Sequence, residues 1–263
     1  MMREINPENP LPPPGEAEEA AITALAERQR RAGGLLMKAV NLVGSGVEDG
    51  LRVLPKPLRA RIDAAARAAL LRSYDAAART RTGPLSAPWA GDRAHKALAA
   101  VSGALGGLGG LPTALAELPV ATTVIFRAVQ RVAEAHGEDP LSEETRLECL
   151  RVFGSGGTGG ADDAVDASFL GARLSITGAA VNRLVARVAP RFGAVIGQKL
   201  AAGAVPLIGA AAGAGTNYAF IDYYVEMAHV HFGLRRLGRA HGDEAVLEAF
   251  HRALAGGVAV RRM

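Results

Sequence analysis

Apolar residues recur at helical spacing along most of the chain, separated by short stretches rich in glycine and proline. This pattern predicts helices over 16–32, 34–52, 57–81, 113–136, 140–153, 163–188, 217–237 and 243–255. The segment 57–81 is the clearest, because its alanines and leucines repeat between charged residues with no glycine or proline inside. The sequence therefore predicts one all-α domain of about eight helices over 16–263, preceded by a disordered proline-rich arm over 1–15.

Two long segments, 97–116 and 200–221, carry no charged residue. Each is long enough to cross the hydrocarbon core of a bilayer as a helix. Pro112 weakens the first as a helix and Pro206 divides the second, so a full span, a re-entrant hairpin and a soluble core all stay open. Glycines in and beside the two segments would let another helix pack closely. They are Gly103, Gly106, Gly107, Gly110, Gly193, Gly197, Gly209 and Gly213.

Four polar residues stand beside or within these apolar stretches, and burial would oblige them to find partners. They are Glu117, Arg127, Asn217 and Asp222. We expect Glu117 to pair with Arg127. In the alternative interpretation, each residue marks the point where a helix leaves the apolar layer.

Composition and charge narrow the class of protein. The residues AVILMFWYC make up 49% of the chain but aromatic residues only 5%, so most apolar side chains are small and helices can approach closely. The net charge of +4 favours anionic surfaces. Basic residues concentrate between positions 52 and 81 with few aromatic residues among them, which favours lipid headgroups over nucleic acid. We expect headgroup contacts from Arg52, Lys56, Arg59 and Arg67.

A single cysteine, Cys149, excludes an internal disulfide and a thiolate metal cluster, and a small buried thiol is its expected state. The residues after Met1 lack the apolar core of a signal peptide, which predicts that the protein starts in the cytoplasm.

Two motifs could carry chemistry. Gly154–Gly159 matches the dinucleotide pattern G-x-G-x-x-G, but helical patterns surround it where a βαβ unit needs a strand, which indicates a linker. An aspartate cluster has the spacing D-D-x-x-D, which can hold Mg²⁺ and a diphosphate on one helix face. The cluster is Asp162, Asp163 and Asp166. The other interpretation is a helix start whose acidic residues face the positive end of the helix dipole.

Histidines and helix caps complete the candidates. His229 and His231 are two residues apart, so a helix would turn them to different faces, and we expect solvated or capping side chains instead of a metal pair. Gly137 is suited to end a helix, and Ser142 and Asp243 are suited to begin one. No catalytic signature is present, so we expect no cofactor, and whether the protein is an enzyme stays open.

Several of these segments together resemble the bacterial EcsC family. They are Glu117-Leu-Pro119, the amphipathic run 125–133, His136-Gly137-Glu-Asp139, the glycine-rich loop, Phe169 to Arg173, and Pro206 to Asn217. The family usually has aspartate at Glu117 and tyrosine at His136. The resemblance covers about 20 to 255 and implies an α-helical protein whose family is named for a gene in the operon of an ABC transporter involved in protein secretion. The resemblance does not carry over the residues of an active site.

These patterns together favour a helical protein that docks on, or inserts partly into, the inner face of the cell membrane. The expected partners are an anionic membrane surface or lipid and, as a further option, a membrane protein in transport or secretion. Two alternatives remain: a soluble helical scaffold, and a Mg²⁺-dependent enzyme acting on a lipid or isoprenoid diphosphate.

Overall fold

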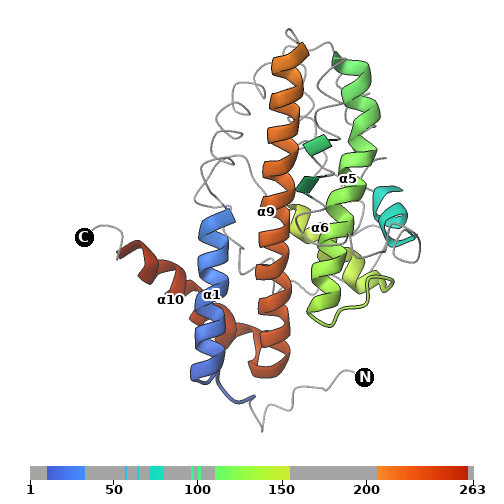
Figure 1. Cartoon of the computed structure of the whole chain (residues 1–263). Coiled ribbons are helices and arrows are strands. Elements are labelled where there is room, and N and C mark those ends of the chain that lie inside the picture. The colour runs from blue at the N-terminus through green and yellow to red at the C-terminus, as the bar shows by residue number, and fades with distance from the viewer. Residues whose placement is uncertain are drawn as a thin grey trace.

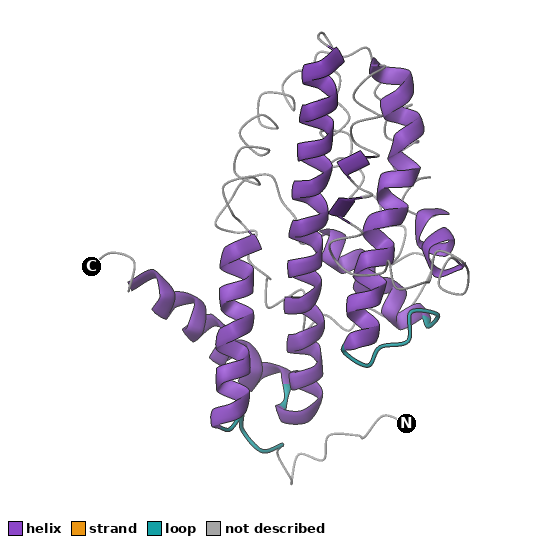
Figure 2. Ribbon diagram, in the orientation of Figure 1, coloured by secondary structure: helices purple, strands orange, loops and turns teal. Residues whose placement is uncertain are grey.

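The computed structural model describes residues 11–32, 72–79, 110–154 and 206–259, together with a few single positions between 57 and 101. The labelled helices are α1 (Glu16–Ala32), α5 (Gly110–Ala135), α6 (Glu143–Gly154), α9 (Pro206–His241) and α10 (Asp243–Ala259). Residues 72–79 are also helical. These ranges contain helices and no strand (Figure 2), which confirms the all-α class; six helices are seen in them, against about eight expected for the whole chain.

The long helix α9 is the centre of the bundle. It contacts α1, α5, α6 and α10, and α1 also packs against α10. Helices α5 and α9 lie side by side and run in the same direction, so that both begin at the upper end of Figure 1. Helices α1, α6 and α10 surround the other end of α9. Thirty-six residues give α9 a length of about 54 Å at the usual helical rise.

Helix α9 corrects the predicted boundaries in the second uncharged segment. Pro206 is the first residue of α9, a position where proline costs no hydrogen bond because the first amides of a helix have no partner inside it. Residues 200–205 of this segment lie outside the described residues, so whether Pro206 divides the segment stays a prediction. The helix predicted over 217–237 and the part of the uncharged segment from residue 206 onward are one continuous element. A continuous helix therefore joins an uncharged first part to a charged second part.

Helix α5 begins at Gly110, three residues before the predicted start, and has Pro112 in its first turn. Pro119 lies inside the helix and removes one backbone donor. Its own carbonyl accepts hydrogen bonds from the hydroxyls of Thr123, at 2.7 Å, and Ser73, at 3.0 Å. The hydrogen bond from Ser73 connects the helical segment 72–79 to α5 at Pro119.

The turn from α5 to α6 is closed by specific hydrogen bonds. Gly137 has a φ of +83°, and the amides of Gly137 and Glu138 donate to the carbonyls of Glu134 and Ala133. This is the Schellman pattern of helix termination. Ser142 then accepts a hydrogen bond from the Thr145 amide at 3.1 Å, as an N-cap does. Both predicted caps are confirmed, and α6 begins at Glu143, three residues later than expected.

The core of the described bundle lies around the second part of α9. Its largest fully buried side chains include Phe126 of α5, Phe232 of α9, Phe250 of α10 and Ile22 of α1. Helix α1 comes so close to α9 that a Cβ on Gly233 would lie 2.8 Å from a methyl carbon of Leu25. Helix α1 has the predicted bounds, and α10 begins at the predicted Asp243 and continues four residues beyond 255.

Candidate functional site

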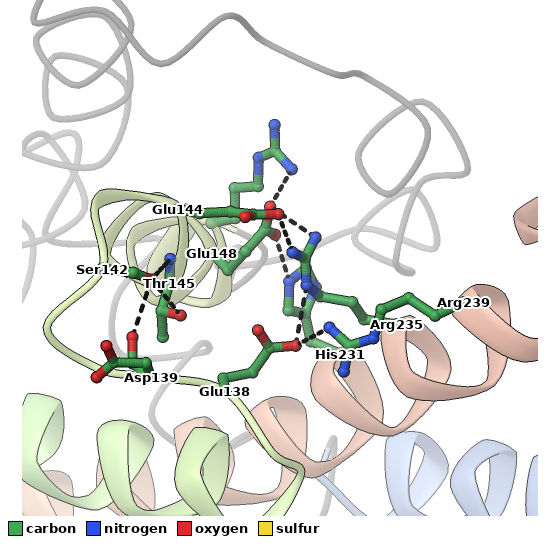
Figure 3. A network of polar contacts seen from close by, with 10 residues as sticks. Glu138, Asp139, Ser142, Glu144, Thr145, Glu148, His231, Arg235 and Arg239 are labelled. Atoms are coloured by element: carbon green, nitrogen blue, oxygen red, sulfur yellow. Dashed lines mark hydrogen bonds and ion pairs between the residues drawn. The ribbon is translucent and has the colours of Figure 1, made fainter. Parts of the chain in front are cut away.

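A buried carboxylate, Glu148 of α6, is the centre of a polar network between α6 and α9 (Figure 3). Its Oε1 accepts hydrogen bonds from Arg151, at 2.7 Å, and Arg235, at 3.3 Å, while its Oε2 accepts one from Nε2 of His231, at 2.7 Å. The side chains of Glu148, Arg151 and His231 are 5%, 8% and 4% exposed. Three donors from two helices therefore surround one buried carboxylate.

The network continues to the surface through Arg235. Glu138, in the turn before α6, accepts hydrogen bonds from Arg235 Nε at 3.0 Å and from Arg239 at 2.5 Å. Glu144, at the exposed end of the network, also pairs with Arg235. Arg235 thus bonds three carboxylates, each from a different position in the turn and α6 (Figure 3).

The electrostatics of Glu148 follow from these partners. Burial alone would raise the pKa of Glu148, but the hydrogen bond from His231 and the positive charges of Arg151 and Arg235 outweigh it and lower the pKa to about 2. Burial by itself would lower the pKa of Arg235, and the carboxylates of Glu148, Glu144 and Glu138 raise it instead. The charged forms are therefore the stable ones, and the network fastens α6 and its preceding turn to α9.

A second buried cluster surrounds Tyr74. The tyrosine hydroxyl donates to the Pro140 carbonyl at 2.8 Å, and the Arg146 guanidinium lies over its ring at 5.3 Å from the centroid. Burial raises the pKa of the Tyr74 hydroxyl and of the Cys149 thiol. Cys149 is fully buried, as its sequence context predicts, and its thiol is kept in the protonated, weakly nucleophilic form.

The histidine prediction is wrong, because His231 is neither solvated nor a cap. It is 3% exposed and bonded to Glu148, while His229 faces the ring of His136. The helix does turn the two side chains to different partners, as expected from their spacing. Among the described residues, no group of three His, Cys, Asp or Glu side chains is arranged to hold a metal ion.

Sequence reasoning did not identify this network, although the spacing carries a signal. Glu144, Glu148 and Arg151 are at i, i+4 and i+7 on α6, and His231 and Arg235 are four apart on α9. The residues of each set share one helix face. Carboxylates on one face and basic side chains on the other can form ion pairs and hydrogen bonds when the two helices pack together. The sequence cannot show that these two helices are neighbours.

The predicted buried polar residues are dispersed along α5 and α9. Asn217 is buried in α9, and Asp222 pairs with Lys96. Arg127 is partly buried in α5. Ten residues of continuous helix separate Glu117 and Arg127 by about 15 Å along the axis, so a pair between them would need both side chains extended along α5. The side chain of Glu117 is outside the described residues, and that pair stays a prediction.

Three of the glycine candidates lie in described helices. Gly110 is the first residue of α5, and Gly209 and Gly213 lie in the first turns of α9. The remaining candidate positions lie outside the described residues; they are Arg52, Lys56, Arg59, Arg67, Gly103, Gly106, Gly107, most of the loop 154–159, Asp162, Asp163, Asp166, Gly193 and Gly197.

Charge divides the pair of long helices into two halves. The apolar half consists of residues 110–126 of α5 and 206–221 of α9, and it contains one charged residue, Glu117. The charged half consists of the remainder of both helices. Because α5 and α9 are parallel, the apolar parts lie at the same end of the bundle (Figure 1). Within the part of the chain that the structure describes, no helix has the length and hydropathy needed to cross a bilayer.

Exposed apolar side chains occur in the apolar half. Val120 of α5 is 54% exposed and Tyr218 of α9 is 41% exposed. Lys96 pairs with Asp222 at the boundary of the halves, and its ammonium lies 5.9 Å from the centroid of the Tyr218 ring. A tyrosine beside a lysine at the edge of an apolar region is typical of residues at a membrane–water boundary.

The comparison with family models gives one match. The model of the EcsC protein family matches residues 59–237, which is about two thirds of the chain. No curated protein and no solved structure matches the chain at a significant level. The matched region contains all of α5, all of α6 and most of α9, and so includes the apolar half and the network around Glu148 except Arg239. On the extent of this match, the chain belongs to the EcsC protein family.

Proposed function

We propose that this protein docks on an anionic membrane surface through the apolar half of α5 and α9. The observation that carries the proposal is the parallel arrangement of the two longest helices described. It brings their apolar parts, which contain one charged residue, to one end and their charged parts to the other. A bundle with this polarity can place one end at or in the interface while its charged end stays in water.

Two features support docking at this end. Val120 and Tyr218 already expose apolar surface there. Burial of apolar surface stabilises binding by about 25 cal/mol for each Å² that is removed from water. Tyr218, Lys96 and Asp222 then lie at headgroup level, where an aromatic ring and a paired ammonium are both stable. Arg52, Lys56, Arg59 and Arg67 would add contacts to anionic headgroups.

The proposal places the protein at the inner face of the cell membrane, bound peripherally or with partial insertion. In that position its role is that of an accessory factor in transport or secretion, with a membrane protein as its partner. The network around Glu148 holds the charged half together in this account and has no catalytic role.

Vesicle binding tests the proposal. The full chain is sedimented with phosphatidylglycerol vesicles and with phosphatidylcholine vesicles at low salt. We expect cosedimentation with the anionic vesicles, weakened by high salt where headgroup contacts dominate and retained through alkaline carbonate where insertion dominates. A protein that stays in the supernatant at low salt contradicts the proposal and favours a soluble scaffold or an enzyme.

Charge substitutions locate the docking end. Val120→Glu places a carboxylate in the apolar half, and we expect it to weaken vesicle binding by about tenfold or more, since a charged group in hydrocarbon costs a few kcal/mol. Tyr218→Glu places a carboxylate at headgroup level, where anionic headgroups repel it, and should weaken binding as well. Leu141→Glu is the matched control, because Leu141 is 72% exposed and lies in the turn beyond α5. Equal losses in all three variants would show that binding does not depend on the apolar half.

A further inference from the structure

Two histidine rings meet where α5 ends. His136 is the last residue before Gly137, and its Nε2 lies 3.3 Å from Nδ1 of His229 on α9. The ring centroids are 5.6 Å apart with the planes at 72°. The centroid distance exceeds the nitrogen distance by about the width of one imidazole ring, so the two nitrogens lie on the line between the rings and face each other. Such a contact has room for one hydrogen, donated by one ring and accepted by the other.

Two arginines and one carboxylate act on His136. Arg28 of α1 and Arg236 of α9 act on His136, and the carboxylate of Glu138, in the turn, opposes them. Arg28 is itself bonded to Glu226 of α9 at 3.0 Å.

The other nitrogen of His136, Nδ1, is buried and has no hydrogen-bond partner among the described residues. Burial, the second imidazole and the two arginines lower the pKa of His136 to about 4. The neutral form is therefore the one that fits this site.

We propose that the His136–His229 pair is a proton-sensitive contact that holds the turn 136–142 on α9 while it carries one shared hydrogen and releases the turn when both rings are protonated. In the doubly protonated state two N–H groups face each other, and the hydrogen bond is replaced by repulsion. The released turn carries Glu138, which bonds Arg235 and Arg239, so opening also weakens the outer part of the network around Glu148. This inference does not depend on membrane docking.

The sign of the pH effect follows from the direction of the shift. The native pair resists protonation, whereas an opened histidine takes up a proton near its ordinary pKa of about 6.5. The closed turn is therefore fully favoured above about pH 6.5, and the advantage is lost as the pH falls toward 4. The population of the opened turn should rise by up to about tenfold per pH unit in this window for the proton that His136 takes up.

Amide hydrogen exchange of residues 136–142, corrected for the intrinsic effect of pH, tests the inference in the full chain at pH 7, 6 and 5. We expect protection to fall with pH in the natural chain. His136→Gln keeps a side-chain amide that can bond His229 but cannot be protonated, so its protection should stay flat. His251→Gln changes an exposed histidine on α10 and should behave like the natural chain.

Two outcomes would overturn the proposal: an equal loss of protection in His136→Gln, or no loss in the natural chain. If His136→Gln fails to fold, His229→Gln replaces it. A nuclear magnetic resonance titration of the imidazole protons gives a second readout. We expect His136 to titrate well below 6.5 and to shift upward when His229 is replaced, and an ordinary pKa for His136 in the natural chain would contradict the proposal.

Discussion

The two halves of the α5–α9 pair differ in what holds them. In the charged half, α6, the turn before it and α9 are joined by bonds from Arg235 and Glu148, and buried phenylalanines fill the space between the helices. In the apolar half the helices carry one charged residue, Glu117, and the large apolar side chains of Val120 and Tyr218 are exposed. The first half is completed by contacts within the chain. The second presents the kind of surface that a membrane could cover, and variants in the two halves should therefore have separable effects.

The largest expected effect is on stability, from Glu148→Gln. The neutral amide leaves the buried guanidinium of Arg151 without its counter-charge and removes the carboxylate that His231 bonds, and breaking such a buried pair typically costs about 3–5 kcal/mol. Urea unfolding followed by circular dichroism measures the loss. Glu144→Gln, at the exposed end of the same network, should cost less than about 1 kcal/mol. The folded Glu148→Gln variant should bind vesicles as the natural chain does. A loss of binding in the folded variant would show that vesicle binding depends on the charged half as well as on the apolar half.

Acid should weaken the charged half through the same residue. The native pKa of Glu148, about 2, is below its ordinary value of about 4.5, so its stabilising effect is fully present above pH 4.5 and is lost as the pH falls toward 2. The free energy of unfolding should therefore decrease by up to about 3 kcal/mol across this window from this residue. In Glu148→Gln the decrease should be smaller by that amount. If the free energy of unfolding decreases with pH equally in the variant and the natural chain, the pKa of Glu148 is not lowered in the native state.

Glycine substitutions compare packing in the two halves. Gly233→Ala would press a new methyl group against Leu25 of α1 and should cost about 1–3 kcal/mol, because Leu25 must shift. Gly215→Ala, in the apolar half, meets nothing within 4 Å and should be neutral or stabilising by up to about 1 kcal/mol, since alanine favours a helix. Thermal unfolding in dilute buffer measures both. A cost at Gly215 as large as that at Gly233 would reveal close packing in the apolar half as well.

The smallest expected effect is at the surface of α10. Arg252 and Glu248 form an exposed pair at i and i+4, and Arg252→Gln should change the free energy of unfolding by less than about 0.5 kcal/mol. Urea unfolding at low and high salt checks this. A loss above 1 kcal/mol would show that α10 is held by this pair in addition to its contacts with α1 and α9.

Local pattern was sufficient for the helices whose ends have strong signals. The bounds of α1, the start of α10 at Asp243 and the caps at Gly137 and Ser142 are set by residues next to one another in the chain, and they were predictable for that reason. The predicted start of α9, at 217, is later than the observed one at Pro206, because apolar residues with few polar ones between them give no clear helical period at this end.

The sequence by itself determined the all-α class, the contrast between charged and uncharged segments and the family resemblance, because composition and periodicity are local properties of the chain. The tertiary structure alone decided which segments are neighbours. It placed His231 against Glu148, His136 against His229, and the apolar parts of α5 and α9 at one end. These contacts join residues about 80 to 100 positions apart, and the spacing within one helix carries no information about the partner helix.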